Sequence, residues 1–270
     1  MKFLDRVEER TRLLKLLNGT DGALACLYGR RRCGKTRLLH ECVEELPNTI
    51  YYLADRSERP AQLARFVKES TRVFPAMAAA APDDWGSVLD LWTALAPRDA
   101  VLVLDEFPYL VEKDEALPSV LQRIVDTIVS TGHKIVICGS SQRMMQGLVL
   151  KASEPLYGRA REILPIRPLG FGWLREAFPK MTPFQRLQLW CVCGGGCRVI
   201  GNFRKMSRRS GGRYAVMLQI RLAFCGMSRI TCCSTMLAMR HRLLPCSHSS
   251  AGGRIGRRRL PRGCNVRLPT

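Results

Sequence analysis

Acidic residues are missing from the last part of this sequence. The last carboxylate is Glu176, and residues 191–270 contain no Asp or Glu against 16 basic residues, of which only Lys205 is lysine. The net charge of +20 belongs mainly to this tail, because residues 1–190 carry 27 basic and 23 acidic residues. The overall charge is therefore no evidence that the first 190 residues bind nucleic acid, since they have the balance of an ordinary globular domain.

Long apolar runs are also absent, and cysteine is sparse before residue 191. No run approaches the ~18 residues that a membrane span requires. Charged residues at positions 2, 5 and 6 interrupt the start, so we expect no secretory signal. We expect a cytoplasmic protein without a membrane partner, whose early cysteines are reduced thiols. These cysteines are Cys26, Cys33, Cys42 and Cys138, whereas the other eight lie at or beyond Cys191.

One glycine-bounded turn carries the strongest chemical signal. It follows the apolar run 23–28, opens a helical pattern, and matches G-x-x-x-x-G-K-[ST], the phosphate-binding loop (P-loop, Walker A), without a mismatch. The glycines allow backbone N–H groups to curl toward phosphate oxygens, and the helix N-terminus adds its positive dipole end. Lys35 is expected to reach the β- and γ-phosphates, and Thr36 to ligate Mg²⁺. The remaining nucleotide-binding candidates here are Gly29, Arg30, Arg31, Arg32, Cys33, Gly34 and Arg37.

A second stretch ends in two adjacent carboxylates. The apolar run 100–104 is typical of a strand buried on both faces, and Asp105 and Glu106 follow it. Ligands of open α/β sheets sit at this carboxyl edge. We expect Asp105 to hold Mg²⁺ through water and Glu106 to polarise the attacking water (Walker B). A buried strand that merely ends in a polar turn is the alternative, which the pairing with the P-loop disfavours.

Strand patterns alternate with helix patterns along residues 1–169. This alternation predicts an α/β fold, a P-loop NTPase with a mostly parallel sheet flanked by helices and followed by a partial helical subdomain. The expected strands are 23–28, 49–53, 100–104, 134–139 and 162–165. The expected helices are 3–17, 35–46, 62–74, 85–95, 117–129, one that begins near 143, and further helices within 171–190.

Two serines follow the expected strand 134–139. Either Ser140 or Ser141 could sense the γ-phosphate or position the attacking water at that strand end. N-capping of the next helix is the competing interpretation, and both remain open.

In this order the residues resemble archaeal-type P-loop ATPases, an AAA-like group related to STAND proteins. The resemblance covers about residues 1–195. It depends on Phe3-x-x-Arg6-x-x-Glu9, Tyr28–Thr36, Tyr51-Tyr52-Leu53-Ala54, Leu104–Leu110, Gly139-Ser140-Ser141, Pro155–Arg159 and Pro168-Leu169. It implies an extra strand between the P-loop strand and the Asp105 strand, and a Phe3–Glu9 box near the adenine. It also implies that Arg159 either contacts phosphate in trans or stabilises the sheet edge.

The combined pattern predicts a protein that binds ATP and hydrolyses it with Mg²⁺, with Glu106 and Lys35 as catalytic residues. Nucleotide state would be coupled to a protein partner, another copy of the chain, or nucleic acid. One alternative is a P-loop kinase, although Glu106 directly after Asp105 favours water as the acceptor. Another is a non-hydrolysing nucleotide switch or a DNA-associated interaction protein.

The resemblance ends abruptly after Gly195. The family pattern continues into a helical lid with Gly-Gly-Val-Pro and an aromatic residue, but here Gly196, Cys197 and Arg198 follow. A one-base shift at Gly196–Cys197 permits the family-like continuation Val-Pro-Arg-Tyr-Trp-Glu-Leu. We therefore divide the chain into an ATPase core (1–169), the start of a lid (170–195) and a basic tail (196–270) that is out of frame or poorly ordered. Without an intact lid, ATP binding and hydrolysis would be impaired.

Two functional hypotheses compete for the tail. Clustered arginines neutralise phosphates, which indicates nucleic-acid binding through Arg254, Arg257, Arg258, Arg259 and Arg262. A zinc site would combine the tail cysteines with His241 or His248, but paired C-x₂-C spacings are absent. A poorly ordered tail is favoured over both, because Gly, Ser and Arg dominate its end.

Overall fold

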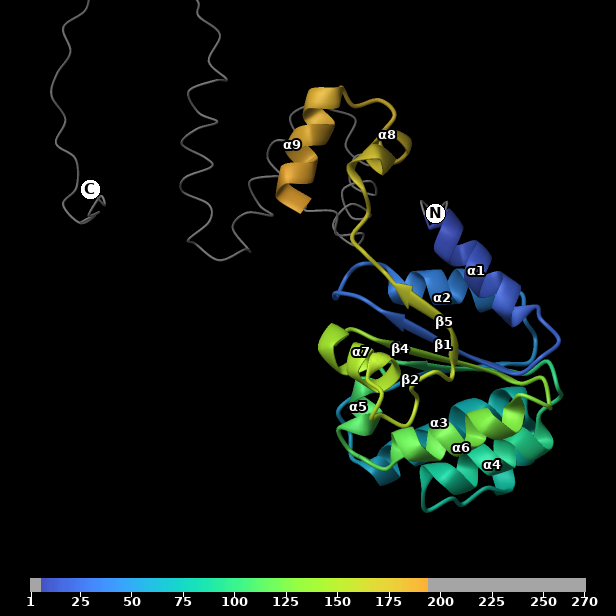
Figure 1. Ribbon diagram of the computed structural model, residues 1–270. Helices are drawn as coiled ribbons and strands as arrows, with labels where there is room; N and C mark the ends of the chain where they lie inside the picture. Colours follow the sequence, from blue (N-terminus) through green and yellow to red (C-terminus); the bar gives the residue numbers. More distant parts are fainter. Residues whose placement is uncertain (1–5, 194–270) are drawn as a thin grey trace, which may run out of the picture. The chain divides into compact units, whose positions relative to one another are not determined.

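Five parallel strands form one sheet in the described part of the chain (Figure 1). The structure is a computed structural model that describes residues 6–193. The strands are β1 (Ala23–Tyr28), β2 (Thr49–Leu53), β3 (Val101–Asp105), β4 (Lys134–Gly139) and β5 (Ala160–Pro165). Their order is β2-β3-β4-β1-β5, so β4 lies between the P-loop strand and the Asp105 strand, as the resemblance implies.

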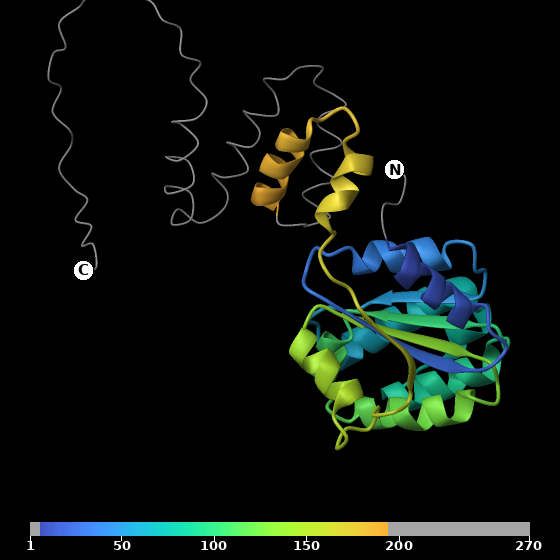
Figure 2. The ribbon, with the colours of Figure 1, turned by 45° about the horizontal axis from the view of Figure 1, so that its top comes forward.

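Helices cover both faces of this sheet. Helices α1 and α2 lie on one face, and α3, α4 and α6 lie on the other (Figures 1 and 2). The longer helices are α1 (Val7–Leu17), α2 (Lys35–Val43), α3 (Arg59–Val73), α4 (Trp85–Leu95), α6 (Leu117–Ile128), α7 (Gln142–Leu150) and α9 (Pro183–Cys193). The short ones are α5 (Pro108–Val111), α8 (Leu174–Ala177) and the 3₁₀ turns η1 (Pro75–Ala79) and η2 (Phe171–Trp173). The predicted α/β architecture is confirmed.

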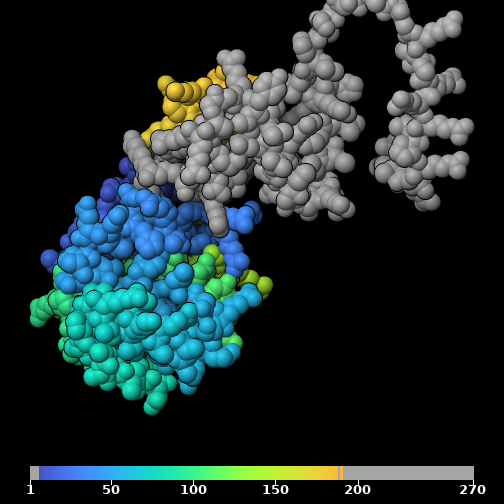
Figure 3. Space-filling view, turned by 180° about the vertical axis from the view of Figure 1, so that it is seen from behind, coloured from blue at the N-terminus to red at the C-terminus, as the bar shows by residue number. Residues whose placement is uncertain are grey.

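The continuous apolar runs of the strands are explained by burial on both faces. In β3, Leu102 and Leu104 belong to the hydrophobic cluster that includes α3, α4 and α6, whereas Val101 and Val103 belong to the cluster beneath α1 and α2. Alternation along a strand thus feeds two separate cores. Seen from behind, one face of this unit is formed mostly by the blue-to-teal, N-terminal part of the sequence (Figure 3).

Element boundaries follow the sequence patterns closely, with local exceptions. Strands β1, β2 and β4 match their predicted ranges, and β5 begins two residues earlier than predicted. Helix α3 begins at Arg59 rather than 62, because Pro60 suits the first turn of a helix. Helix α5 was not predicted. Predictions for residues 1–5 and 194–270, including the tail, lie outside the described residues. Within residues 6–193, no helix has the length and apolar content needed to cross a membrane.

Candidate nucleotide-binding site

Three turns converge at the carboxyl edge of the sheet. The P-loop follows β1, the Asp105-Glu106 turn follows β3, and Ser140 follows β4. Parallel pairing of these three adjacent strands brings their carboxyl ends to one edge. The resulting hydrogen bonds run from Lys35 through Ser140 to Glu106, and from Thr36 to Asp105. The structure therefore places the catalytic and metal candidates of the sequence analysis in one constellation.

The P-loop turns directly into α2. Gly34 caps this helix in the left-handed region with φ 93°, a conformation that glycine adopts without a Cβ penalty. Lys35 follows at the helix N-terminus with its side chain buried, and its Nζ donates to the Gly29 carbonyl at 2.9 Å. The ammonium also donates to Ser140 Oγ at 3.0 Å. A positive group and a helix N-terminus thus face the same edge, which is the arrangement that binds phosphate.

Gly29 has a different physical reason for being glycine than its partner Gly34. The positive-φ glycines of the described chain include Gly34 but not Gly29. A Cβ added at Gly29 would lie 2.1 Å from the Ile166 carbonyl oxygen, just after β5. Gly29 is thus required by the close approach of a neighbouring backbone, rather than by the curl that the motif alone suggested.

The P-loop arginines point to different neighbours. Arg31 donates to the Tyr109 hydroxyl, and the side chains of Arg30 and Arg32 are exposed. Arg37 pairs with Glu41 along α2 at 3.1 Å. The buried Cys33 side chain belongs to the core beneath α1 and α2.

Arg32 also has a strained backbone, with φ 68°. Non-glycine residues in this region cost of order 1–3 kcal/mol and cluster at functional sites. The P-loop conformation is thus maintained by its surroundings.

Asp105 is fully buried at the end of β3. Its Oδ2 accepts a hydrogen bond from Thr36 Oγ1 at 2.8 Å, and its Oδ1 accepts one from the Glu106 backbone N–H at 2.9 Å. Burial raises the pKa of the neighbouring Cys138 thiol well above its ordinary value, and the charge of Asp105 adds to this effect. The thiol is therefore neutral and adds no second negative charge beside Asp105.

Glu106 is held by Ser140. Its Oε1 accepts from Ser140 Oγ at 2.6 Å, and its Oε2 accepts from the Ser140 backbone N–H at 3.3 Å. Glu106 itself has φ 55°, so the turn that aims its carboxylate is strained. The N-cap of α7 is Ser141, which makes no side-chain cap hydrogen bond. Ser140 instead contacts Lys35 and Glu106, the two catalytic candidates. N-capping by a side-chain hydrogen bond therefore explains neither serine.

The oxygen donors at this edge fit Mg²⁺ rather than a softer metal. Asp105 supplies a carboxylate and Thr36 a hydroxyl, and hard cations prefer such ligands. Within residues 6–193, no cluster of three or more His, Cys, Asp or Glu side chains could hold a metal ion by itself. Mg²⁺ commonly uses one or two protein oxygens and completes its octahedron with water and substrate phosphates, so a sparse donor set is suitable.

Arg159 lies away from the P-loop of its own chain. It immediately precedes β5, whereas the P-loop follows β1, and parallel strands place these two positions at opposite edges of the sheet. Its guanidinium pairs with Asp126 of α6 at 2.8 and 3.0 Å and donates to the Pro155 carbonyl at 3.1 Å. Of the two roles implied by the resemblance, these contacts correspond to stabilisation at the edge of the sheet.

Two side-chain contacts at this site were not predicted from the sequence. Tyr51 donates its hydroxyl to Asp105 Oδ2 at 2.7 Å, although it was noted only as part of a family landmark. The buried Arg6 side chain donates to the Cys33 carbonyl at 3.2 Å and to the Arg167 carbonyl. Neither signal is readable from spacing, since both contacts join segments far apart in the sequence. The sequence named Arg6 only within the Phe3–Glu9 box expected near the adenine, and its described contacts join the P-loop to the segment that follows β5.

Comparison with known proteins identifies the family. Residues 3–187 match the ATPase domain found predominantly in Archaea. An uncharacterised protein of Methanocaldococcus jannaschii is 37% identical over 194 residues, which are 72% of this chain and 42% of that protein. The chain thus spans less than half of the length of this relative.

Solved structures show the same fold at low sequence identity. A Walker-type ATPase of Pyrococcus abyssi is similar with a TM-score of 0.61 at 20% identity, over 89% of this chain and 77% of that one. The ORC2 protein of Aeropyrum pernix gives a TM-score of 0.57 at 16% identity, over 82% and 68%. The ORC1 protein of the same organism, solved in complex with DNA, gives a TM-score of 0.54 at 18% identity, over 91% of this chain and 70% of that one. Because the family match covers residues 3–187, the chain belongs to the predominantly archaeal ATPase domain family and contains a Walker-type P-loop ATPase domain.

Proposed function

We propose that this chain hydrolyses ATP with Mg²⁺ and couples its nucleotide state to a partner. The single observation that supports this most strongly is the hydrogen-bonded constellation of Lys35, Ser140 and Glu106 beside the Thr36–Asp105 pair. When bound, Mg²⁺ would be held by Thr36 and Asp105 and would neutralise charge on the phosphates. Lys35 binds phosphate oxygens, and Glu106 polarises the attacking water or accepts its proton.

Water as the acceptor is supported by the placement of Glu106. Its carboxylate lies at the same sheet edge as the P-loop and is oriented by both hydrogen bonds from Ser140. A general base must be positioned before its basicity matters. This geometry favours an ATPase over a kinase that transfers the phosphoryl group to a small acceptor.

The partner is proposed at a coarser level. The partner is another copy of the chain, a different protein or nucleic acid, and the last is suggested by the fold shared with an ORC1 protein solved in complex with DNA. A non-hydrolysing switch is the second candidate function, because nucleotide affinity alone suffices for it.

Single-turnover phosphate release from the full chain tests the proposal. We expect release that requires Mg²⁺, with or without added DNA. Tight ATP binding with no Mg²⁺-dependent release, even with DNA present, would contradict hydrolysis and favour the switch. Transfer of the phosphoryl group to an added small acceptor in place of phosphate release would favour a kinase.

A further inference from the structure

Asp105 receives a second hydroxyl on the same oxygen that contacts the P-loop. Tyr51 Oη lies 2.7 Å from Asp105 Oδ2, and Thr36 Oγ1 lies 2.8 Å from that oxygen. An ionised carboxylate only accepts hydrogen bonds, so both hydroxyls are donors. Donation by Thr36 leaves its oxygen lone pairs available to a cation. Tyr51, in contrast, donates from a phenol that belongs to neither motif.

The position of the Tyr51 hydroxyl is set from two sides. Its backbone lies in β2, opposite Val103 of β3 in the parallel register, so it stands two residues short of the Asp105 level. Its ring stacks on His40 of α2, with ring centroids 4.2 Å apart and planes 16° from parallel. Strand pairing and ring stacking together hold the phenol oxygen against the Asp105 carboxylate.

We propose that Tyr51 is a positioning residue for the metal-binding carboxylate, an inference that rests on the proposed Mg²⁺-dependent function. Tyr51 holds Oδ2 in place while the Glu106 backbone N–H holds Oδ1, so the carboxylate cannot rotate away from Thr36. Groups that orient a metal ligand in this way typically cost 10–100-fold in metal affinity when they are removed. The P-loop helix takes part through the stack of His40 on Tyr51.

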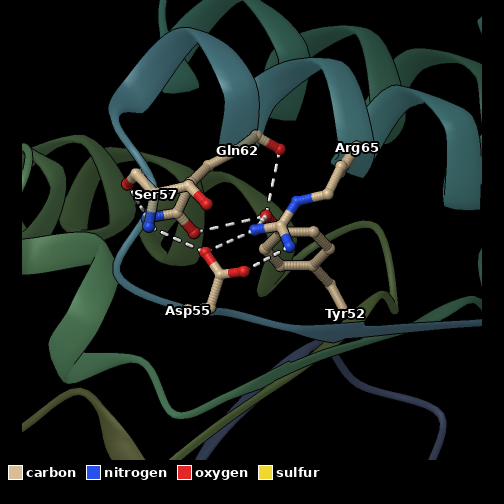
Figure 4. Close-up of polar contacts among 5 residues, drawn as sticks. All are labelled: Tyr52, Asp55, Ser57, Gln62 and Arg65. Atoms are coloured by element: carbon tan, nitrogen blue, oxygen red, sulfur yellow. Dashed lines mark hydrogen bonds and ion pairs between the residues drawn. The ribbon is translucent and has the colours of Figure 1, made fainter.

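The neighbouring Tyr52 provides a matched control. It lies next to Tyr51 in β2, but it faces the other core, where its hydroxyl contacts Gln62 of α3 (Figure 4). Its second partner is Arg65, which is paired with Asp55. Tyr52→Phe therefore removes a phenol from the same strand without touching Asp105.

The test is an Mg²⁺ titration of ATP binding and of phosphate release by the full chain. Tyr51→Phe keeps the ring on His40 and loses only the donor, so we expect the half-saturating Mg²⁺ concentration to rise about tenfold. ATP affinity in EDTA should be unchanged, which a general loss of structure would not allow. Tyr52→Phe should titrate like the unsubstituted chain, and thermal melts of both variants monitor folding.

Should Tyr51→Phe fold poorly, His40→Ala retains the phenol and loosens it, and the half-saturating Mg²⁺ concentration should then rise by a smaller factor. If the unsubstituted chain responds to Mg²⁺ and Tyr51→Phe has the same half-saturating Mg²⁺ concentration, the role of Tyr51 is overturned and the proposed function is not. The same holds for His40→Ala where Tyr51→Phe does not fold. No response to Mg²⁺ in the unsubstituted chain would instead overturn the proposed function, and this inference with it.

Discussion

At the scale of single residues, the site is built from strained and buried groups. Glu106 and Arg32 both have positive φ, and the buried Lys35 and Asp105 side chains are satisfied by their neighbours. Such conformations persist because surrounding contacts over-determine them. Ser140 connects the P-loop to the turn after β3, since its hydroxyl accepts a hydrogen bond from Lys35 and donates one to Glu106.

Substitution of Ser140 tests this bridging role. Ser140→Ala removes the 2.6 Å hydrogen bond to Glu106, so the carboxylate loses its main orienting contact. We expect the single-turnover rate to fall about tenfold or more, because orientation and basicity both act on the attacking water. ATP affinity should change little. Ser141→Ala serves as the control, and equal rates in the two variants would contradict the bridging role.

The motif residues could be predicted from sequence because their chemistry depends on local order. Gly34, Lys35 and Thr36 are adjacent, and Asp105 and Glu106 end an apolar run, so a single segment carries each signal. Tyr51 could not be predicted, because its role depends on which strand lies beside β3. The cis partner of Arg159 was equally unreadable, since Asp126 is 33 positions away.

At the scale of elements, backbone packing determines where glycine is needed. A Cβ at Gly29 would collide with the Ile166 carbonyl at 2.1 Å, whereas a Cβ at Gly147, inside α7, would meet nothing within 4 Å. The structure therefore requires glycine at residue 29 and leaves room for a side chain at residue 147. Strand ranges could be predicted because burial on both faces produces continuous apolar runs. Helix ranges could be predicted because one buried face produces apolar residues at helical spacing.

This contrast gives a paired stability prediction. Gly147→Ala should raise the free energy of unfolding by roughly 0.5–1 kcal/mol, because alanine costs less backbone entropy in a helix. Gly29→Ala should lower it by about 1–3 kcal/mol through overpacking against β5's continuation. Urea titration of both variants at equal protein concentration measures the difference. A Gly29→Ala variant as stable as the parent would show that the backbone yields freely there.

At the scale of the whole molecule, residues 1–190 have nearly balanced charges, whereas residues 191–270 have basic residues and no acidic ones. The family match covers residues 3–187, and acidic residues cease at Glu176. We propose that residues from about 196 onward are read in a shifted frame. Resequencing the coding DNA across Gly194–Cys197 should reveal an alternative frame that encodes Val-Pro-Arg-Tyr-Trp-Glu-Leu and regains carboxylates. Stop codons or an unrelated sequence in that frame would contradict the proposal.

We propose that a single carboxylate, that of Glu106, activates water at a site that binds ATP independently of it. Single-turnover phosphate release from Glu106→Gln measures this most directly, with Glu112→Gln, an exposed glutamate after α5, as the matched control. We predict that Glu106→Gln binds ATP as the unsubstituted chain does but releases phosphate at least about 100-fold more slowly. Glu112→Gln should behave normally. Equal release rates from Glu106→Gln and the unsubstituted chain would remove Glu106 from the mechanism.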